Sequence, residues 1–203
     1  MAVPPHSPLV ADPAKPAVRA RLRTARRGFV EGLRRDDRLA AVLESAAERV
    51  AAHVPAGASV ALYSAFGDEI DPGPLAALLA GRGHRLALPH VGVDGTTLRF
   101  LRWSPGAALI GGRYGLMQPD ENGEEIAPTM ILTPLVGFDR LGGRIGQGAG
   151  YYDRAFAALP GAVRIGFAWS VQELGSVPLD PWDVPLHAVA TETEWIVIGG
   201  AGA

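Results

Sequence analysis

The sequence predicts a single α/β domain in which a mostly parallel central sheet is flanked by helices. Three observations lead to this expectation. Short apolar runs alternate with amphipathic segments along the chain, which is typical of layered α/β domains. No period of about 20–50 residues repeats, so solenoids and propellers are excluded. A chain of 203 residues with 48% hydrophobic residues is also long enough to bury roughly 70% of its unfolded surface.

Two helices are expected at the start of the domain. Residues 1–14 are rich in proline and aperiodic, which predicts a mobile leader before a single domain over residues 15–203. Pro16 suits a first helical turn, and apolar residues then recur every three or four positions on one face, at Val18, Leu22, Ala25, Phe29 and Leu33. Cations step along a different face and predict a basic ridge, formed by Lys15, Arg19, Arg23 and Arg26. A second helix is expected from Asp36 to about His53.

The remaining elements alternate between strands and helices. Apolar runs predict strands over residues 59–64, 85–89, 97–103, 129–133, 163–169 and 195–198. Helices are expected over residues 75–80 and from Tyr151 to about Leu159. Residues 104–128, residues 137–150 and the loop with Pro178, Pro181 and Pro185 are expected to lack regular structure.

Composition excludes several kinds of site. The chain has no cysteine, which excludes disulfides, cysteine-ligated metal centres and thiol nucleophiles. Its five histidines show no metal-ligand spacing. Because no run of about 18 apolar residues occurs and the N-terminus is unlike a secretory signal, we expect a cytoplasmic protein without membrane partners. Lys15 is the only lysine among 19 basic residues, which favours a role for a compact ammonium group there, although chance also explains one lysine.

The strongest local signal is the segment from Arg144 to Asp153, RIGQGAGYYD. Its glycines alternate between a strand and a helix, so main-chain N–H groups and the helix N-terminus can face one concavity that suits a phosphate chain. A plain flexible turn explains the same glycines. The segment fits neither the dinucleotide fingerprint nor the Walker loop, because Tyr151 and Asp153 replace the required glycine and the sole lysine lies far upstream. A bound phosphate would therefore need Lys15 and Arg19.

Four acidic residues are candidates for ligand or metal binding. Asp153, in the first turn of a helix, either complements the helix dipole or holds Mg²⁺ together with Asp183. Asp183 is flanked by prolines and could equally be a turn residue. Glu69 and Asp71 precede a helix and either cap it or point into a cleft at the end of a strand, where they could bind an amino-heterocycle. The two tyrosines of the glycine-rich segment could stack on a planar ligand or pack beneath the loop.

Five separated segments, taken in order, resemble the 5-formyltetrahydrofolate cyclo-ligase family, also called 5,10-methenyltetrahydrofolate synthetases. The resemblance covers nearly the whole chain, and its most specific part is the glycine-rich segment. The matching segments are Lys15-x-x-x-Arg19, Gly67-Asp-Glu-Ile-Asp71, Pro134–Asp139 followed by Arg144–Arg154, Gly166–Gln172, and Asp183-x-Pro185 with Thr191-Glu192.

The resemblance implies a role for particular residues. It implies ATP contacts at Lys15, Arg19, Arg144, Gly146, Gln147, Gly148, Ala149, Gly150, Tyr151 and Tyr152. Folate contacts are implied at Phe66, Asp71, Gln147, Gly148, Ala149, Gly150 and Tyr151, and Glu69 is added because it lies between two matched positions. Mg²⁺ is implied at Asp153 and Asp183, and a catalytic role at Lys15 and Arg144. Two positions depart from the pattern: Ala149, where members often have Gly or Lys, and His187, where Asp is common.

The implied reaction is an ATP- and Mg²⁺-dependent cyclisation of 5-formyltetrahydrofolate to 5,10-methenyltetrahydrofolate, with release of ADP and phosphate. The γ-phosphoryl group moves to the formyl oxygen, N10 attacks the activated carbon, and phosphate departs. Such chemistry mainly requires positioning and charge neutralisation, and no general base stands out in the sequence.

Two other functions stay open. The basic helix at the start of the domain could bind nucleic acid, but no nucleic-acid partner is expected because the rest of the chain is acidic, with a pI of about 6.2. A sugar-phosphate isomerase or transferase on a similar sheet would bind phosphate without needing ATP.

Overall fold

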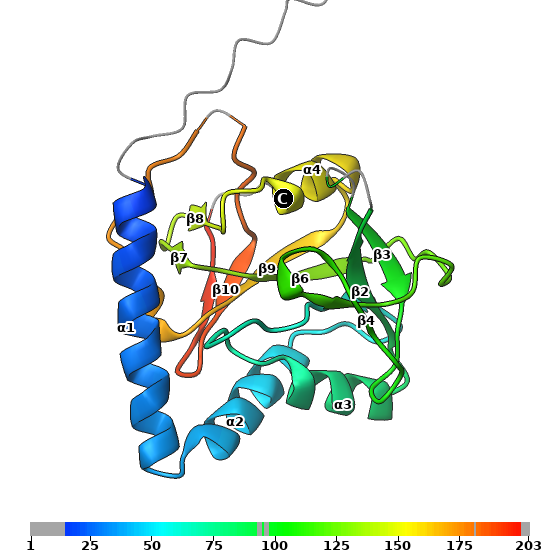
Figure 1. Cartoon of the computed structure of the whole chain (residues 1–203), viewed down its shortest axis with the longest axis horizontal. Coiled ribbons are helices and arrows are strands. Elements are labelled where there is room, and N and C mark those ends of the chain that lie inside the picture. The colour runs from blue at the N-terminus through cyan, green and yellow to red at the C-terminus, as the bar shows by residue number, and fades with distance from the viewer. Residues whose placement is uncertain (1–14, 93–94, 96–97, 181, 200–203) are drawn as a thin grey trace, which may run out of the picture.

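The computed structural model of the chain describes residues 15–92, 95, 98–180 and 182–199 (Figure 1). The leader expected over residues 1–14 lies outside this described part. The helices are α1 (Lys15–Arg35), α2 (Leu39–Ala51), α3 (Gly73–Gly81) and α4 (Tyr151–Ala158), with 3-10 turns η1 (Arg113–Gly115) and η2 (Ser170–Gln172). None of these described helices combines the length and apolarity needed to cross a membrane.

The predicted mostly parallel sheet is confirmed. Seven strands lie in the order β11-β10-β9-β6-β1-β2-β3. The five inner strands are parallel, whereas β3 and β11 are antiparallel edge strands. The strands of this sheet are β1 (Ser59–Ala61), β2 (Arg85–Val91), β3 (Leu98–Arg102), β6 (Met130–Pro134), β9 (Val163–Phe167), β10 (Ala188–Ala190) and β11 (Trp195–Val197).

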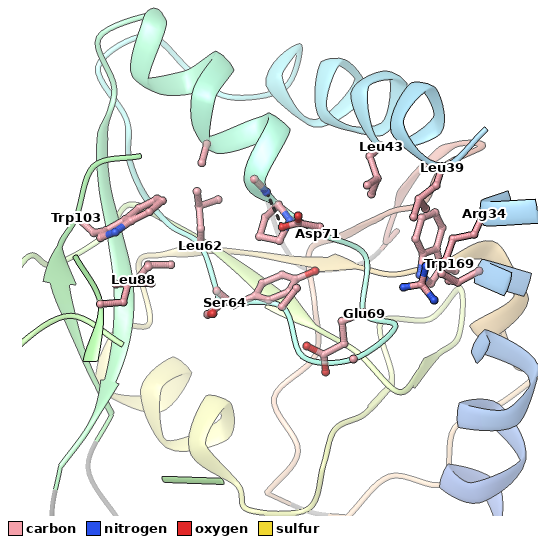
Figure 2. A pocket seen from close by; sticks show the side chains of 18 residues that line it. Arg34, Leu39, Leu43, Leu62, Ser64, Glu69, Asp71, Leu88, Trp103 and Trp169 are labelled. Atoms are coloured by element: carbon pink, nitrogen blue, oxygen red, sulfur yellow. Dashed lines mark hydrogen bonds between the residues drawn. The ribbon is translucent and has the colours of Figure 1, made fainter. Parts of the chain in front are cut away.

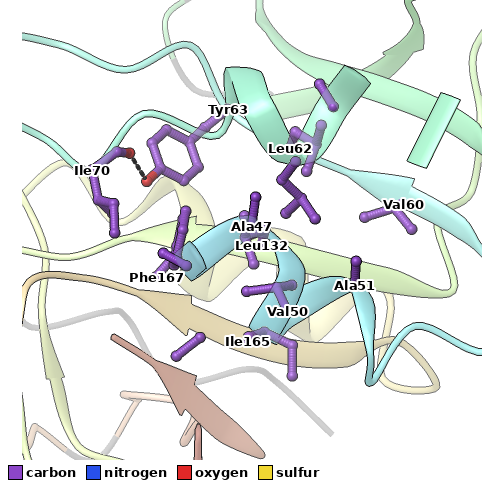
Figure 3. Packing of buried hydrophobic residues seen from close by; sticks show 14 of the residues in the cluster. Ala47, Val50, Ala51, Val60, Leu62, Tyr63, Ile70, Leu132, Ile165 and Phe167 are labelled. Carbon is purple, nitrogen blue, oxygen red and sulfur yellow. Dashed lines mark hydrogen bonds between the residues drawn. The ribbon is translucent and has the colours of Figure 1, made fainter. Parts of the chain in front are cut away.

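The core consists of two layers, one on each face of the sheet. Successive residues of a strand point to opposite faces, so Val60 belongs to one buried cluster and Ala61 to the other. Residues of α1, α2 and α3 pack on the first face, and residues of α4 on the second. Figure 3 shows the small residues Ala47 and Ala51 of α2 lying over the first face. In Figure 1, α2 and α3 lie on one side of the sheet and α4 on the other.

The buried face of α1 differs from the predicted one. Leu22 and Leu33 are buried as expected, but Lys15 and Arg26, which the sequence analysis assigned to a separate basic ridge, are also buried, and Ala25 is exposed. The reason is that the first half of α1 packs on polar loops around the glycine-rich segment and not only on the apolar sheet. The basic ridge required for nucleic-acid binding is therefore interrupted.

Five short strands form where the sequence predicted loops. β10 lies in the segment expected to be a proline-containing loop. It was missed because it has only three residues, which pair with the parallel strand β9 on one side and the antiparallel strand β11 on the other. The surface segment contains a hairpin of β4 (Ile110–Gly111) and β5 (Met117–Gln118). The glycine-rich loop begins with a hairpin of β7 (Gly137–Phe138) and β8 (Arg144–Ile145). Strands of two or three residues are too short to show a hydrophobic period.

Candidate active site

The glycine-rich loop lies against the first half of α1. The Nε of Arg19 donates a hydrogen bond of 2.8 Å to the carbonyl oxygen of Gly146, across 127 residues of sequence. Arg23, one turn further along α1, donates to the side-chain oxygen of Gln147. Gly148 has φ of +104°, a backbone conformation that favours glycine, and it lies next to the Arg19 guanidinium. The structure thus brings the predicted cation Arg19 and the predicted loop together.

Lys15 is buried in an acidic setting at the start of α1. Its side chain is 7% exposed, and its ammonium group donates hydrogen bonds to Asp180 and, at 3.2 Å, to Asp183. Burial alone would lower the pKa of Lys15, but the hydrogen bonds and charges of the two aspartates outweigh it and raise the pKa. Lys15 therefore stays cationic. Asp183 was a predicted site residue, whereas Asp180 was not, because its only signal in the sequence is its position three residues before Asp183.

Arg144 and Asp153 form a second ion pair, in which the Arg144 side chain is 6% exposed and the Asp153 side chain 25% exposed. Arg144, at the end of the β7–β8 hairpin, donates hydrogen bonds to the Asp153 carboxylate and to the carbonyl oxygen of Val184. Its guanidinium lies 4.7 Å from the ring centre of Phe156. Burial lowers the pKa of Arg144, and Asp153 acts against that shift. Asp153 therefore neutralises a cation as well as lying in the first turn of α4.

The two predicted metal ligands lie near one segment of chain, at Val184. The main-chain N–H of Val184 lies 3.4 Å from the Asp153 carboxylate, and Asp183 precedes Val184. Asp183 also accepts a hydrogen bond of 2.8 Å from the main-chain N–H of Asp180. Each carboxylate already faces a cation, and within the described part of the chain no group of three or more His, Cys, Asp or Glu side chains is arranged to hold a metal.

A separate, mostly apolar cavity of about 400 Å³ opens beside the acidic loop (Figure 2). Its walls come from the ends of α1, α2 and α3, from β2, and from the loops after β1, β3 and β9. Figure 2 shows Trp103 and Trp169 at opposite ends of this cavity, with Glu69 and Asp71 between them. A volume of this size suits an organic ligand with fused rings.

The two acids of the predicted folate loop have different surroundings. Asp71 is exposed and accepts a hydrogen bond of 2.9 Å from the main-chain N–H of Gly73 at the start of α3, so it serves at least as a helix cap. The side chain of Glu69 is 7% exposed. It accepts hydrogen bonds of 3.0 Å from the Phe66 N–H and 3.2 Å from the side-chain amide of Gln147. Glu69 therefore joins the cavity to the glycine-rich loop.

Electrostatics distinguish Glu69 further. Burial raises the pKa of Glu69, while the Phe66 N–H, the Arg26 charge and the Gln147 amide act in the opposite direction. The nearest guanidinium nitrogen of Arg26 lies 3.9 Å from the Glu69 carboxylate. Arg26 was predicted as part of a surface ridge, so its place in this buried network was missed. The sequence offered no signal for it beyond its type.

The aromatic residues of the site differ in their exposure and in their contacts. Tyr151 donates a hydrogen bond of 2.8 Å to the carbonyl oxygen of Gly95, and the Arg154 guanidinium lies 5.2 Å from its ring centre. The ring of Tyr152 packs against Phe156, with 6.0 Å between ring centres, and burial raises the pKa of its hydroxyl. Phe66 is 54% exposed, so one ring of the predicted folate loop is open to a ligand.

His187, the departure noted in the sequence, has a structural partner. The main-chain N–H of Arg164 donates a hydrogen bond of 2.9 Å to its Nδ1, and the Arg164 guanidinium lies 2.9 Å from its Nε2. Burial and the charge of Arg164 lower the pKa of His187. These contacts of His187 hold the segment after Asp183 against β9.

Ala149, the other departure noted in the sequence, is bound through its main chain. Its carbonyl oxygen accepts a hydrogen bond of 3.1 Å from the Arg154 side chain.

Fold and site together define an α/β enzyme in which a cation-lined glycine loop adjoins an apolar cavity. Comparison with known proteins gives the same class. The sequence profile of the 5-formyltetrahydrofolate cyclo-ligase family matches residues 11–192. The chain is 33% identical over 152 residues to the 5-formyltetrahydrofolate cyclo-ligase of Escherichia coli K12, covering 68% of this chain and 81% of that protein. It is also 33% identical over 152 residues to the Mycolicibacterium smegmatis protein of the same name, covering 70% and 77%.

A solved structure shows the same fold. The NMR structure of Aquifex aeolicus 5,10-methenyltetrahydrofolate synthetase superposes with a TM-score of 0.76 at 28% identity, covering 94% of this chain and 95% of that one. The chain therefore belongs to the 5-formyltetrahydrofolate cyclo-ligase family, as the sequence motifs indicated.

Proposed function

We propose that this chain converts 5-formyltetrahydrofolate to 5,10-methenyltetrahydrofolate, with ATP as co-substrate and Mg²⁺ as metal, and releases ADP and phosphate. The observation that carries the proposal is the contact between α1 and the glycine-rich loop, where Arg19 meets Gly146. This contact brings side-chain cations of α1 to a loop whose main-chain N–H groups are available for phosphate oxygens, and Gln147 of that loop donates to Glu69 in the wall of the cavity. Two substrates that must react with each other can therefore bind side by side.

The nucleotide part of the proposal concerns charge. A triphosphate needs several cations and N–H donors. Arg19 contacts the loop at Gly146, Arg144 lies two residues before Gly146, and Lys15, paired with Asp180 and Asp183, would supply the third cation. Lys15 is held as an ammonium by Asp180 and Asp183, so it has the right charge before ATP arrives. A compact ammonium binds phosphate oxygens as a point charge, whereas a guanidinium binds them as a fork.

The residues at the end of the loop fit a magnesium ion. Mg²⁺ in nucleotide sites usually takes one or two carboxylates and completes its shell with phosphate oxygens and water. Asp153 accepts from the Val184 N–H and Asp183 precedes Val184, and both side chains keep some exposure, 25% and 14%. Bound there, Mg²⁺ would offset negative charge on the transferring phosphoryl group.

The folate part of the proposal rests on the cavity. Its apolar lining and two tryptophans suit a planar ring system. Asp71 is an acceptor for the amino groups of a pterin, and Glu69 would contact the folate nearer the glycine-rich loop. Phe66 is exposed between the lining residues Ala65 and Gly67, so its ring can cover a bound folate. The segment from Gln147 to Tyr151 would contact both substrates, because Gln147 contacts Glu69 in the cavity wall and Arg23 on the first half of α1.

The proposed reaction requires no covalent bond between the protein and a substrate. The formyl oxygen of the substrate is a poor leaving group until the γ-phosphoryl group of ATP is transferred to it. Phosphoryl transfer is accelerated mainly by alignment and by neutralising charge, and Lys15 and Arg144 would supply the neutralising charge. N10 then attacks the activated carbon, and phosphate leaves to complete the 5,10-methenyl bridge.

The test is a spectroscopic assay on the purified chain. We expect the ultraviolet absorbance of the methenyl product to rise only when 5-formyltetrahydrofolate, ATP and Mg²⁺ are all present. Omitting ATP or adding a chelator in excess over Mg²⁺ serves as the control. An unchanged spectrum at high enzyme concentration, or turnover indifferent to ATP, would reject the proposed reaction.

A further inference from the structure

A buried and incomplete ion pair joins α1 to the acidic loop. Arg26 is 6% exposed, and its guanidinium reaches only the Leu135 carbonyl oxygen at 3.5 Å and the Glu69 carboxylate at 3.9 Å. Within the described part of the chain its Nε has no hydrogen-bond partner. Burying a charge without full pairing is unfavourable for folding. Such a pair in a cleft is therefore more easily explained by function than by stability.

Glu69 is the member of this pair that reaches the substrate cavity. It lines the cavity wall, and each of its oxygens accepts one hydrogen bond, from Phe66 at 3.0 Å and from Gln147 at 3.2 Å. A carboxylate oxygen has two acceptor positions, so each oxygen keeps one. Because Gln147 belongs to the glycine-rich loop, Glu69 lies where the proposed folate and ATP sites meet, which is where the reacting carbon must be.

No other described group that lines the cavity is both buried and available to accept a proton. Asp71 is exposed and caps α3 through Gly73. The Tyr63 hydroxyl is committed to the Ile70 carbonyl oxygen at 2.5 Å, and burial raises its pKa far above the usual value. Among the described lining residues there is no histidine. Glu69 is thus the buried base available in this cavity.

We propose that Glu69 accepts the proton that N10 loses when it attacks the activated formyl carbon, and that Arg26 is a positioning residue that keeps Glu69 ionised. This inference rests on the proposed cyclo-ligase reaction. The bond from N10 to carbon forms, the bond from carbon to the phosphorylated oxygen breaks, and phosphate leaves with that electron pair. The N10 proton passes to the Glu69 carboxylate, which becomes a neutral carboxylic acid and later releases the proton to solvent. No oxidant or reductant is required.

The charged and titratable groups around Glu69 determine how its ionisation responds to mutation. They come from four directions: Arg23 and Arg26 on α1, Asp68 and Asp71 on its own loop, Tyr63 after β1, and Tyr152 on α4. Burial raises the pKa of Glu69 and Arg26 lowers it. Removing the Arg26 charge must therefore raise the pKa of Glu69 further. Glu69 is then protonated, and lost as a base, at a higher pH than in the wild-type chain.

The first experiment uses Glu69→Gln, which keeps the size of the side chain and can still accept from Phe66, while the Gln147 amide can rotate to pair with it. Under single-turnover conditions with both substrates saturating, we expect the rate of methenyl formation to fall by about 10²–10⁴-fold. Folate binding, measured by quenching of the tryptophan fluorescence from Trp103 and Trp169, should change little. An unchanged rate, or a loss confined to folate affinity, would overturn the inference while wild-type turnover still upholds the cyclo-ligase reaction.

The second experiment compares pH–rate profiles. In Arg26→Gln the acidic limb of the single-turnover rate should move to higher pH, and Arg26→Lys should return it toward the wild-type position. Arg27→Gln is the matched control, because Arg27 is the next residue on α1 but is 71% exposed and pairs with Asp68 at 3.8 Å. Equal shifts in the Arg26 and Arg27 variants, or no shift in either, would contradict a positioning role. If the wild-type chain forms no methenyl product, the proposed function fails first.

Discussion

At the scale of single residues, burial distinguishes the cations that pair with carboxylates inside the site from those that face solvent. Lys15, the single lysine, is buried against Asp180 and Asp183, whereas most of the arginines of α1 face solvent. The sequence drew attention to Lys15 by its uniqueness and to Arg19 by its spacing. It could not show that Arg26 is buried, because an arginine at a helical position is usually exposed and its burial follows from a loop more than 40 residues away, at Glu69.

Lys15→Ala should weaken ATP binding more than folate binding. The substitution removes a charge-assisted contact to phosphate, worth about 1.5–3 kcal/mol, or roughly a 10- to 100-fold loss of ATP affinity. Isothermal titration with each substrate measures both affinities. Arg21→Ala, an exposed cation on the same helix, is the control and should leave both affinities near wild type. Equal losses for ATP and folate in Lys15→Ala would count against a role on the phosphates.

Asp153→Asn tests the metal site. The substitution removes one proposed Mg²⁺ ligand while keeping a side-chain oxygen near Arg144, so we expect a higher Mg²⁺ concentration for half-maximal activity. The measurement is the activity at saturating ATP and folate as Mg²⁺ is titrated. An unaltered Mg²⁺ titration with a lower maximal rate would assign Asp153 to holding Arg144 and to the helix dipole alone.

At the scale of elements, the site depends on how α1 packs against the β7–β8 hairpin. Leu22 of α1 contacts Val136, Ile145 and Val177 in a small apolar cluster beside the glycine-rich loop. Gly137 permits this close packing, since a Cβ atom there would lie 2.5 Å from the Cδ1 of Leu22. Helices and long inner strands were predictable from periodicity. The β7–β8 hairpin was not, because its strands of two residues pair through tertiary packing.

Gly137→Ala should destabilise the chain and weaken ATP binding together. Forcing a methyl group into this contact costs about 1–3 kcal/mol of unfolding free energy, which lowers Tm by roughly 2–4 °C for each kcal/mol in a chain of this size. Because Leu22 and Arg19 share one helix, ATP affinity should also fall. Thermal unfolding and ATP titration measure the two effects. In the control Gly175→Ala the new methyl group meets no atom within 4 Å, and equal behaviour of the two variants would contradict this account of the packing.

At the scale of the whole molecule, the parallel sheet gathers segments that the chain keeps far apart. The α/β class followed from alternation of apolar runs, but strand order did not, because β1 lies between β2 and β6 and the two edges turn antiparallel. The residues that meet at the site come from α1, from the loop after β1, from the loop before α4 and from the segment before β10. The order of the motifs in the sequence indicated which segments form the site. The distances between their residues could be known only from the folded structure.

The central claim is that α1 and the distant glycine-rich loop form one site for the triphosphate of ATP. A crystal structure of the chain with Mg²⁺ and a non-hydrolysable ATP analogue tests it most directly. We predict that the phosphates lie between the Lys15 and Arg19 side chains on one side and the main-chain N–H groups from Gly146 to Gly150 on the other. Phosphates bound elsewhere, with Lys15 still paired only to Asp180 and Asp183, would contradict the claim.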